Sequence, residues 1–171
     1  MKKLLIFSIL IMMNSCSSPK ASINENDNLY GMATKADFQK NGFHVWYNEE
    51  YHNYTVNKNA IKFLKEKSKN ITIKAFMGTW CSDSRREIPR FYKILDAIDF
   101  NMKKFQLVAV NRDKKSPNGL EKGKHINYVP TFIFYENDKE IGRIVESPIV
   151  SLEEDFLTII NHKPYTPNYA E

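Results

Sequence analysis

Cys81 and Ser84 are the residues of this chain whose types and spacing are best suited to chemistry. Cys81 follows an apolar, β-branched stretch that begins at Ile71 and breaks at Gly78 and Thr79, and a helical pattern starts directly behind it. A cysteine at such a junction lies close to the free N–H groups of the helix, which favour negative charge. Because the thiolate is the nucleophilic form of cysteine, this position predicts a reactive thiol. Ser84 lies one helical turn further on, so we expect its hydroxyl to hydrogen-bond the sulfur.

The charged residues beside Cys81 act in opposite directions. Arg85 and Arg86 add positive charge, which favours a thiolate, and Asp83 adds negative charge, which opposes it. His125, further along the chain, is a candidate proton shuttle, although a role outside catalysis is the more common one for such a histidine. The sequence therefore leaves the net electrostatic effect on the thiol open.

The elements that position Cys81 follow from hydrophobic periodicity. Apolar residues recur every three or four positions behind Cys81 and predict a helix from Ser82 to about Asp99, bent at Pro89. A shorter helix from Asn57 to about Lys67 precedes the strand, and Phe105 to Val110 has the nearly continuous apolar composition of a buried parallel strand. A polar loop or short irregular helix is expected over Asn111–Asn127. Two strands of an antiparallel hairpin follow, over Thr131–Tyr135 and Glu140–Val145, and a closing helix begins at Ser151 and is stopped by Pro164. This order predicts an α/β domain with a parallel βαβ unit followed by a hairpin.

At this point the chain resembles the thioredoxin superfamily. Trp80-Cys81-x-x-Ser84 is similar to the Trp-Cys-x-x-Cys site of that superfamily with serine at the second cysteine, and Pro89 falls where thioredoxins have a helix-kinking proline. Val129-Pro130-Thr131 resembles the cis-proline loop that faces the cysteine. The resemblance covers about residues 57–162 and is closest to a bacterial thioredoxin-like branch. It implies a three-layer fold with a central mixed sheet flanked by helices, Cys81 and Ser84 as catalytic positions, and Trp80, Val129, Pro130 and Thr131 as substrate-binding residues.

Two departures from thioredoxin limit the chemistry that we expect. Ser84 replaces the cysteine that releases a bound substrate, and Ala75 stands where thioredoxin has a buried acid. The first hypothesis is therefore a thiol oxidoreductase in which Cys81 forms a mixed disulfide that an external thiol resolves. The second is a catalytically inactive thioredoxin-fold binding module, and the third and weakest is a metal chaperone, since no second soft ligand is evident. The expected partners are protein or small-molecule thiols and disulfides, and no cofactor or bound metal is expected.

The N-terminal segment indicates export. Lys2 and Lys3 precede an apolar run from Leu4 to Met13, and Cys16 follows it at the place where a bacterial lipoprotein is cleaved and acylated. The alternatives are an ordinary secretory signal cut nearby and an uncleaved anchor. The preferred interpretation predicts lipidation of Cys16 and attachment to the non-cytoplasmic, periplasmic side of a bacterial membrane.

The domain organisation expected from these patterns has five parts. They are a signal peptide over 1–15, a lipoprotein tether over 16–28, an aromatic-rich extension packed on the core over 29–56, the thioredoxin-like domain over 57–162 and a loose tail over 163–171. The net charge of +5 is too small to indicate nucleic-acid binding, and 42% apolar residues suit a globular protein.

Overall fold

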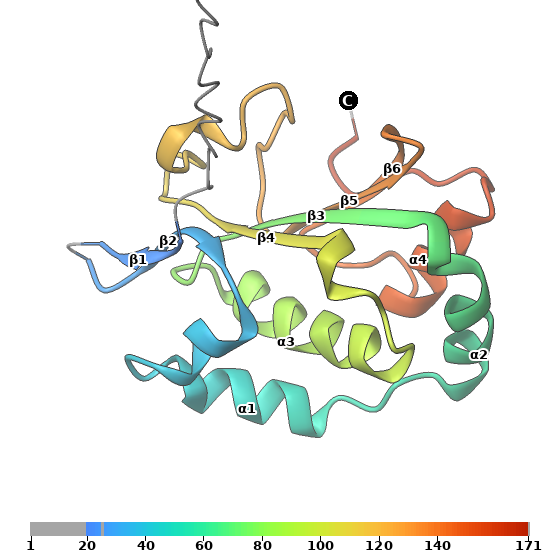
Figure 1. Cartoon of the computed structure of the whole chain (residues 1–171), viewed down its shortest axis with the longest axis horizontal. Helices are drawn as coiled ribbons and strands as arrows, with labels where there is room; N and C mark the ends of the chain where they lie inside the picture. Colours follow the sequence, from blue (N-terminus) through green and yellow to red (C-terminus); the bar gives the residue numbers. More distant parts are fainter. Residues whose placement is uncertain (1–19, 25, 171) are drawn as a thin grey trace, which may run out of the picture.

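The structure, a computed structural model, describes residues 20–24 and 26–170. It contains a six-stranded sheet with helices packed on it (Figure 1). The strands are β1 (Ser22–Ile23), β2 (Leu29–Ala33), β3 (Ile71–Met77), β4 (Phe105–Ala109), β5 (Thr131–Glu136) and β6 (Lys139–Val145). The α-helices are α1 (Phe43–Asn53), α2 (Lys58–Lys67), α3 (Ser82–Ala97) and α4 (Leu152–Ile160). Short 3-10 turns cover Lys35–Gln39, Ser68–Asn70, Met102–Lys104 and Pro117–Gly119.

The sheet is mixed, with strand order β1-β2-β4-β3-β5-β6. Only β3 and β4 run parallel among these strands, with Met77 opposite Ala109, and the other neighbours pair antiparallel. The crossover from β3 to β4 is α3, which is the βαβ unit expected from the sequence, and β5 and β6 form the expected hairpin. The predicted thioredoxin-like α/β fold is therefore confirmed.

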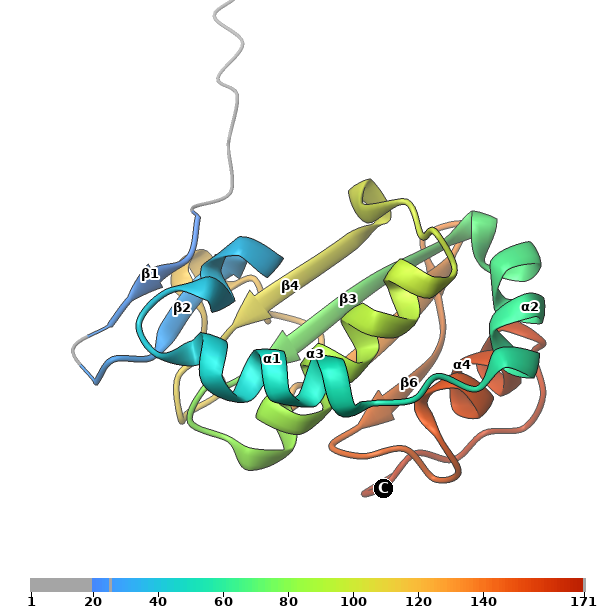
Figure 2. The ribbon, with the colours of Figure 1, turned by 90° about the horizontal axis from the view of Figure 1, so that it is seen from below.

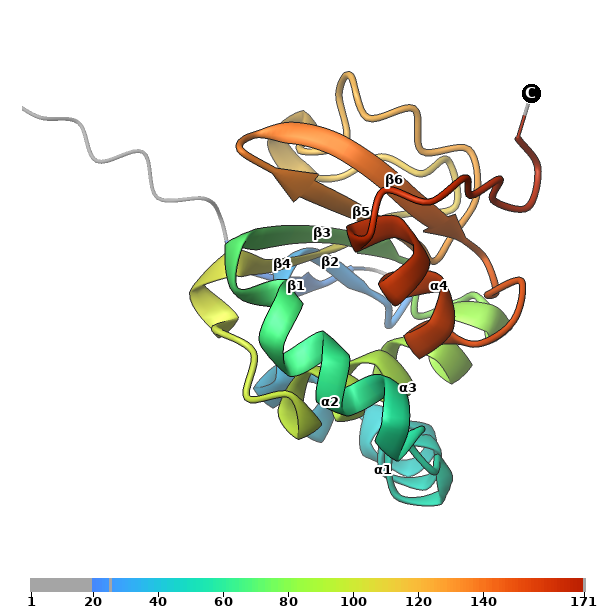
Figure 3. The ribbon, with the colours of Figure 1, turned by 90° about the vertical axis from the view of Figure 1, so that its right-hand side faces the viewer.

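Strand residues alternate between two hydrophobic clusters on opposite faces of the sheet. Ile73, Ala75 and Met77 of β3 face the helices, whereas Phe76 faces the other way. Figures 1 and 3 show α3 beneath the sheet and α1 on the far side of α3, and Figure 2, seen from below, shows α2 and α4 at the other end of the sheet. Ala75 is fully buried in this helix-side cluster.

The second face of the sheet is covered by the irregular segment between β4 and β5. Leu120, Ile126 and Val129 pack there against Phe76 and Val108. Its backbone contains a single 3-10 turn, Pro117–Gly119, in place of a regular helix. The loop or short irregular helix expected over Asn111–Asn127 is confirmed, and the segment ends at the Pro130 turn beside Cys81.

The N-terminal region is more closely joined to the sheet than the sequence suggested. Strand β2 pairs with the open edge of β4, and β1 pairs with β2, so the sheet begins well before residue 57 and includes part of the stretch expected to be a tether. The aromatic extension packs on the core as expected: Phe38 and Tyr47 are buried and stack with ring centroids 5.0 Å apart. The predicted signal peptide and Cys16 lie outside the described residues.

The C-terminal tail is docked, and the expectation of a loose tail is wrong for residues 165–169. The Tyr165 hydroxyl donates to buried Asp155 at 2.8 Å, and the Asn168 side chain donates to the Ser147 carbonyl at 2.9 Å. Tyr169 stacks on Tyr128 with centroids 4.3 Å apart. The polar composition of the tail concealed these contacts, because each partner lies in a distant part of the sequence.

Candidate functional site

Cys81 lies at the end of the short connection between β3 and α3, as the sequence predicts. It is the N-cap residue of α3, it is half-buried, and its side chain packs against the cluster on the loop-covered face of the sheet. The thiol donates a hydrogen bond to the Val129 carbonyl, with sulfur and oxygen 3.1 Å apart. The peptide bond between Val129 and Pro130 is cis, as expected, so the cysteine and the Pro130 turn form one site.

The Pro130 turn is held by its own hydrogen bonds. The Thr131 hydroxyl donates to the Tyr128 carbonyl at 2.7 Å, and the amide of Glu146 donates to the Pro130 carbonyl at 2.7 Å. Val129 and Thr131 are almost fully buried, whereas Tyr128 is exposed and carries the stacked ring of Tyr169. The turn therefore presents its backbone to Cys81 and an aromatic pair to solvent.

Ser84 differs from expectation. Its side chain is fully buried, and its hydroxyl oxygen accepts a hydrogen bond from the Gly78 amide at 3.2 Å, while the contact described for the Cys81 sulfur is with Val129. The spacing predicted a contact along the helix, but the buried Gly78 amide needs an acceptor and lies within reach. Ser84 therefore braces the loop before the cysteine.

The neighbouring charges are engaged with each other. Arg86 pairs with Asp83 at 2.8 Å and with Glu87 at 2.6 Å, and the Arg85 guanidinium donates to the Thr79 carbonyl. Burial raises the pKa of Glu87, with the ion pair to Arg86 opposing that shift. Asp83 and Arg86, which the sequence places on opposite sides of the charge balance near the sulfur, are therefore paired with each other.

Trp80 covers the strand end next to Cys81. Its indole N–H donates to the Val110 carbonyl at 3.0 Å, and the Arg112 guanidinium lies 5.2 Å from its ring centroid. The ring lies directly over Gly78, where an added Cβ would come within 2.4 Å of an indole carbon. Gly78 and Arg112 therefore belong to the site.

Thr79 joins the site to the N-terminal strands and was not foreseen either. Its fully buried hydroxyl accepts from the Leu29 amide at 3.2 Å and donates to the Asn28 side chain at 2.9 Å. The only feature of the sequence that points to this role is that Thr79 is a polar residue among apolar ones. The β1–β2 turn is thereby fixed beside Trp80.

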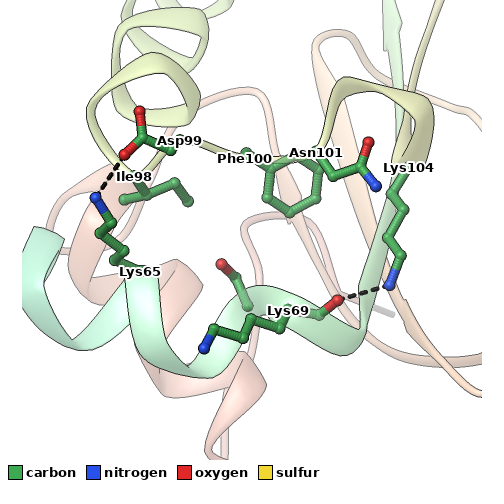
Figure 4. Close-up of a pocket in the computed structure, with 8 residues that line it drawn as sticks. Lys65, Lys69, Ile98, Asp99, Phe100, Asn101 and Lys104 are labelled. Carbon is green, nitrogen blue, oxygen red and sulfur yellow. Dashed lines mark hydrogen bonds and ion pairs between the residues drawn. The ribbon is translucent and has the colours of Figure 1, made fainter.

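Other predicted features lie away from Cys81. His125 is exposed in the segment before the Pro130 turn, and its carbonyl accepts from Arg143. The hollow drawn in Figure 4, between α2 and the end of α3, has lysines at its rim and contains none of the expected site residues. It is separated from Cys81 by the length of α3, about 24 Å for a helix of this size. Within residues 20–24 and 26–170, no three metal-ligating side chains lie together.

A family model described as Thioredoxin matches residues 52–156. The chain belongs to the thioredoxin family. The matched region of this thioredoxin-family chain contains β3 to β6, most of α4, Cys81 and the Pro130 turn, whereas β1, β2 and nearly all of α1 precede it.

Two relatives and one solved structure place this thioredoxin domain among known proteins. A thioredoxin-like protein of Acanthamoeba polyphaga mimivirus is 27% identical over 97 residues, which cover 55% of this chain and just under two thirds (66%) of the viral protein. A type-H thioredoxin of Oryza sativa subsp. japonica is 27% identical over 107 residues, covering 63% of this chain and 74% of the plant protein. A crystal structure of a protein of unknown function from Pseudomonas aeruginosa shares the fold, with a TM-score of 0.54, 11% identity and coverage of 77% and 81% of the two chains.

No helix in the described ranges is both long and apolar enough to cross a bilayer.

Proposed function

We propose that this thioredoxin-family protein is a thiol oxidoreductase that acts through one cysteine, Cys81, by forming a mixed disulfide with a disulfide substrate, which an external thiol then resolves. The observation that carries the proposal is the placing of a half-buried Cys81 thiol 3.1 Å from the Val129 carbonyl, beside cis-Pro130. The position three residues on holds a buried serine, so the chain lacks the neighbouring second thiol of a dithiol enzyme.

The proposed reaction is thiol–disulfide exchange. The Cys81 thiol loses its proton, and its thiolate attacks one sulfur of a disulfide R–S–S–R′; the bond between Cys81 and that sulfur forms as the S–S bond breaks, and R′S⁻ leaves and takes up a proton. A second, external thiolate then attacks the mixed disulfide and returns Cys81 as a thiolate. One disulfide is consumed and one is produced in the cycle.

The surroundings of Cys81 support resolution from outside. Ser84 Oγ accepts a hydrogen bond from the Gly78 amide and carries no sulfur. Ala75, which stands where thioredoxin has a buried acid, is fully buried in the helix-side cluster and cannot accept a proton. A mixed disulfide at Cys81 thus has no internal nucleophile near it in the described structure. The adduct persists until an external thiol arrives.

The same proposal includes the location of the protein. The basic start, the apolar run from Leu4 to Met13 and the cysteine at position 16 support a lipid on Cys16 that holds the domain on the non-cytoplasmic side of a bacterial membrane. We expect Cys16→Ser to abolish labelling by a radioactive fatty acid while the domain stays folded. Labelling that survives the substitution would contradict this assignment.

The experiment that tests the chemistry is a trap in the host cell. Cells expressing the tagged protein are quenched in acid, free thiols are alkylated, and disulfide-linked partners are identified by mass spectrometry. The proposal expects partners on the wild-type protein and none on Cys81→Ser. A Cys81 that is fully alkylated and never linked would instead favour a binding module, for which the thiol is only a hydrogen-bond donor to Val129.

A further inference from the structure

A hollow of about 480 Å³ opens beside Trp80, between the β1–β2 turn and the residues that follow β4. Figures 1 and 2 show these two segments on the same side of the molecule. The walls are Asn24, Asn26 and Asn28 from the turn and Asn111, Arg112 and Asp113 from the segment after β4. The three asparagines of the β1–β2 turn lie outside the region that matches the thioredoxin family model, whereas Asn111, Arg112 and Asp113 lie inside it.

The asparagines present hydrogen-bond donors to the hollow. The Asn24 side-chain oxygen accepts from the amides of Asn26 and Asn28 at 3.0 Å each, and the Asn111 oxygen accepts from the Lys115 amide at 2.9 Å. Since these oxygens are occupied by the backbone, the NH₂ groups of Asn24 and Asn111 are the ends left for a ligand. Neither NH₂ group has an acceptor among the described residues.

Arg112 adds a cation to this set of donors. Its guanidinium lies over the Trp80 ring, 5.2 Å from the centroid, and it has no carboxylate or carbonyl partner within the described part of the chain. Stacking on an aromatic ring leaves the edge of a guanidinium free to bind a carboxylate with two hydrogen bonds. Asp113 is the one acidic side chain described in the wall, and Lys114 and Lys115 follow it, so the segment has an excess of positive charge.

We propose that this hollow binds a carboxylate of the disulfide substrate and thereby selects anionic disulfides for reaction at Cys81. The proposal rests on the proposed function and names the class of its substrate. Trp80 adjoins Cys81 in the chain and forms one side of the hollow, so the hollow begins one residue away from the reactive cysteine. The β1–β2 turn is held in place for this contact by the hydrogen bonds of Thr79 to Asn28 and Leu29.

The test compares three disulfide probes on the full chain carrying Cys16→Ser, which leaves Cys81 as the sole thiol. Glutathione disulfide carries carboxylates, bis(2-hydroxyethyl) disulfide is neutral and cystamine is cationic; intact-mass spectrometry gives the rate at which each modifies Cys81. We expect Arg112→Ala to slow the reaction of Cys81 with glutathione disulfide by about threefold to tenfold relative to its reaction with the neutral probe. Arg112→Lys should slow this reaction by an intermediate amount. Lys69→Ala, which removes one exposed positive charge at the far end of α3, should leave that ratio unchanged.

Three outcomes of the rate comparison overturn the proposal. They are unchanged rates for all three probes in Arg112→Ala, an equal slowing of all three probes, which would mean that Arg112 only supports Trp80, and the same change of the ratio in Lys69→Ala. Binding is also measured without reaction, by titrating the nitrogen-15-labelled protein with S-methylglutathione. If Cys81 reacts with no disulfide while the amides of Asn111 and Arg112 still shift in this titration, the proposed function is wrong and the carboxylate site stands. If these amides do not shift, the carboxylate site is wrong.

Discussion

Thr79 connects the cysteine loop to the N-terminal strands, and its removal has a calculable effect. The side chain is fully buried, accepts from the Leu29 amide at 3.2 Å and donates to Asn28 at 2.9 Å. Thr79→Val keeps the shape and deletes the hydroxyl. The Leu29 amide then has no acceptor in a buried place, whereas half-buried Asn28 can turn to water. An unsatisfied buried donor costs about 1–3 kcal/mol.

We therefore expect Thr79→Val to lower the free energy of unfolding by about 2 kcal/mol, which corresponds to a fall of about 4–8 °C in Tm for a chain of this size. Thr79→Ser is the matched control, because it keeps the oxygen and loses one methyl group, at a cost of about 1 kcal/mol. Urea unfolding measures both, and hydrogen exchange at the Leu29 amide reports the local contact. If Thr79→Val is as stable as Thr79→Ser and the Leu29 amide stays protected, the role given to this hydroxyl is wrong.

Two further substitutions test the packing and the electrostatics of the site. Gly78→Ala forces the Trp80 ring off the strand end, since the new Cβ would clash with the indole. We expect the indole to lose its hydrogen bond to the Val110 carbonyl, the free energy of unfolding to fall by about 1–3 kcal/mol and the tryptophan fluorescence spectrum to shift. An unshifted spectrum would count against this packing role of Gly78. Burial raises the pKa of Glu87 in the folded protein above its value in the unfolded chain. At a pH between these two pKa values the folded protein keeps a proton on Glu87 that the unfolded chain has lost, so the free energy of unfolding falls as the pH rises from the lower value to the higher. Glu87→Gln should remove this fall in a series of urea midpoints from acid to neutral pH, and identical pH profiles for the two proteins would refute the assignment.

The strands and helices around Cys81 were predictable because their patterns are local. The alternation of Ile71, Ile73 and Ala75 against Phe76, and the helical stripe behind Cys81, follow directly from burial on two faces of a sheet and on one face of a helix. Val129-Pro130-Thr131 was identified by its order in the chain relative to Cys81, and the cis bond agrees.

The contacts that complete the site were not predictable, because each depends on a partner distant in sequence. Strand β2 is five residues long and contains Gly31, so its pairing with β4 is decided by the open sheet edge. Ser84 has the spacing for a contact with Cys81, yet the buried Gly78 amide takes its oxygen. The stack of Arg112 on Trp80 depends on where the chain turns after β4, which no local pattern encodes.

The central claim is that Cys81 forms a mixed disulfide that the chain itself cannot release. The most direct measurement is the lifetime of a glutathione adduct at Cys81, followed by mass spectrometry without added thiol, in two proteins that both carry Cys16→Ser. The adduct should persist when position 84 is serine. With Ser84→Cys it should decay as glutathione leaves and a disulfide forms between positions 81 and 84. One helical turn places the Cβ atoms about 5–6 Å apart, and a small shift of Cys81 at the start of α3 brings them to the roughly 4 Å that a disulfide needs. Equal decay in the two proteins, or no adduct in either, would contradict the account.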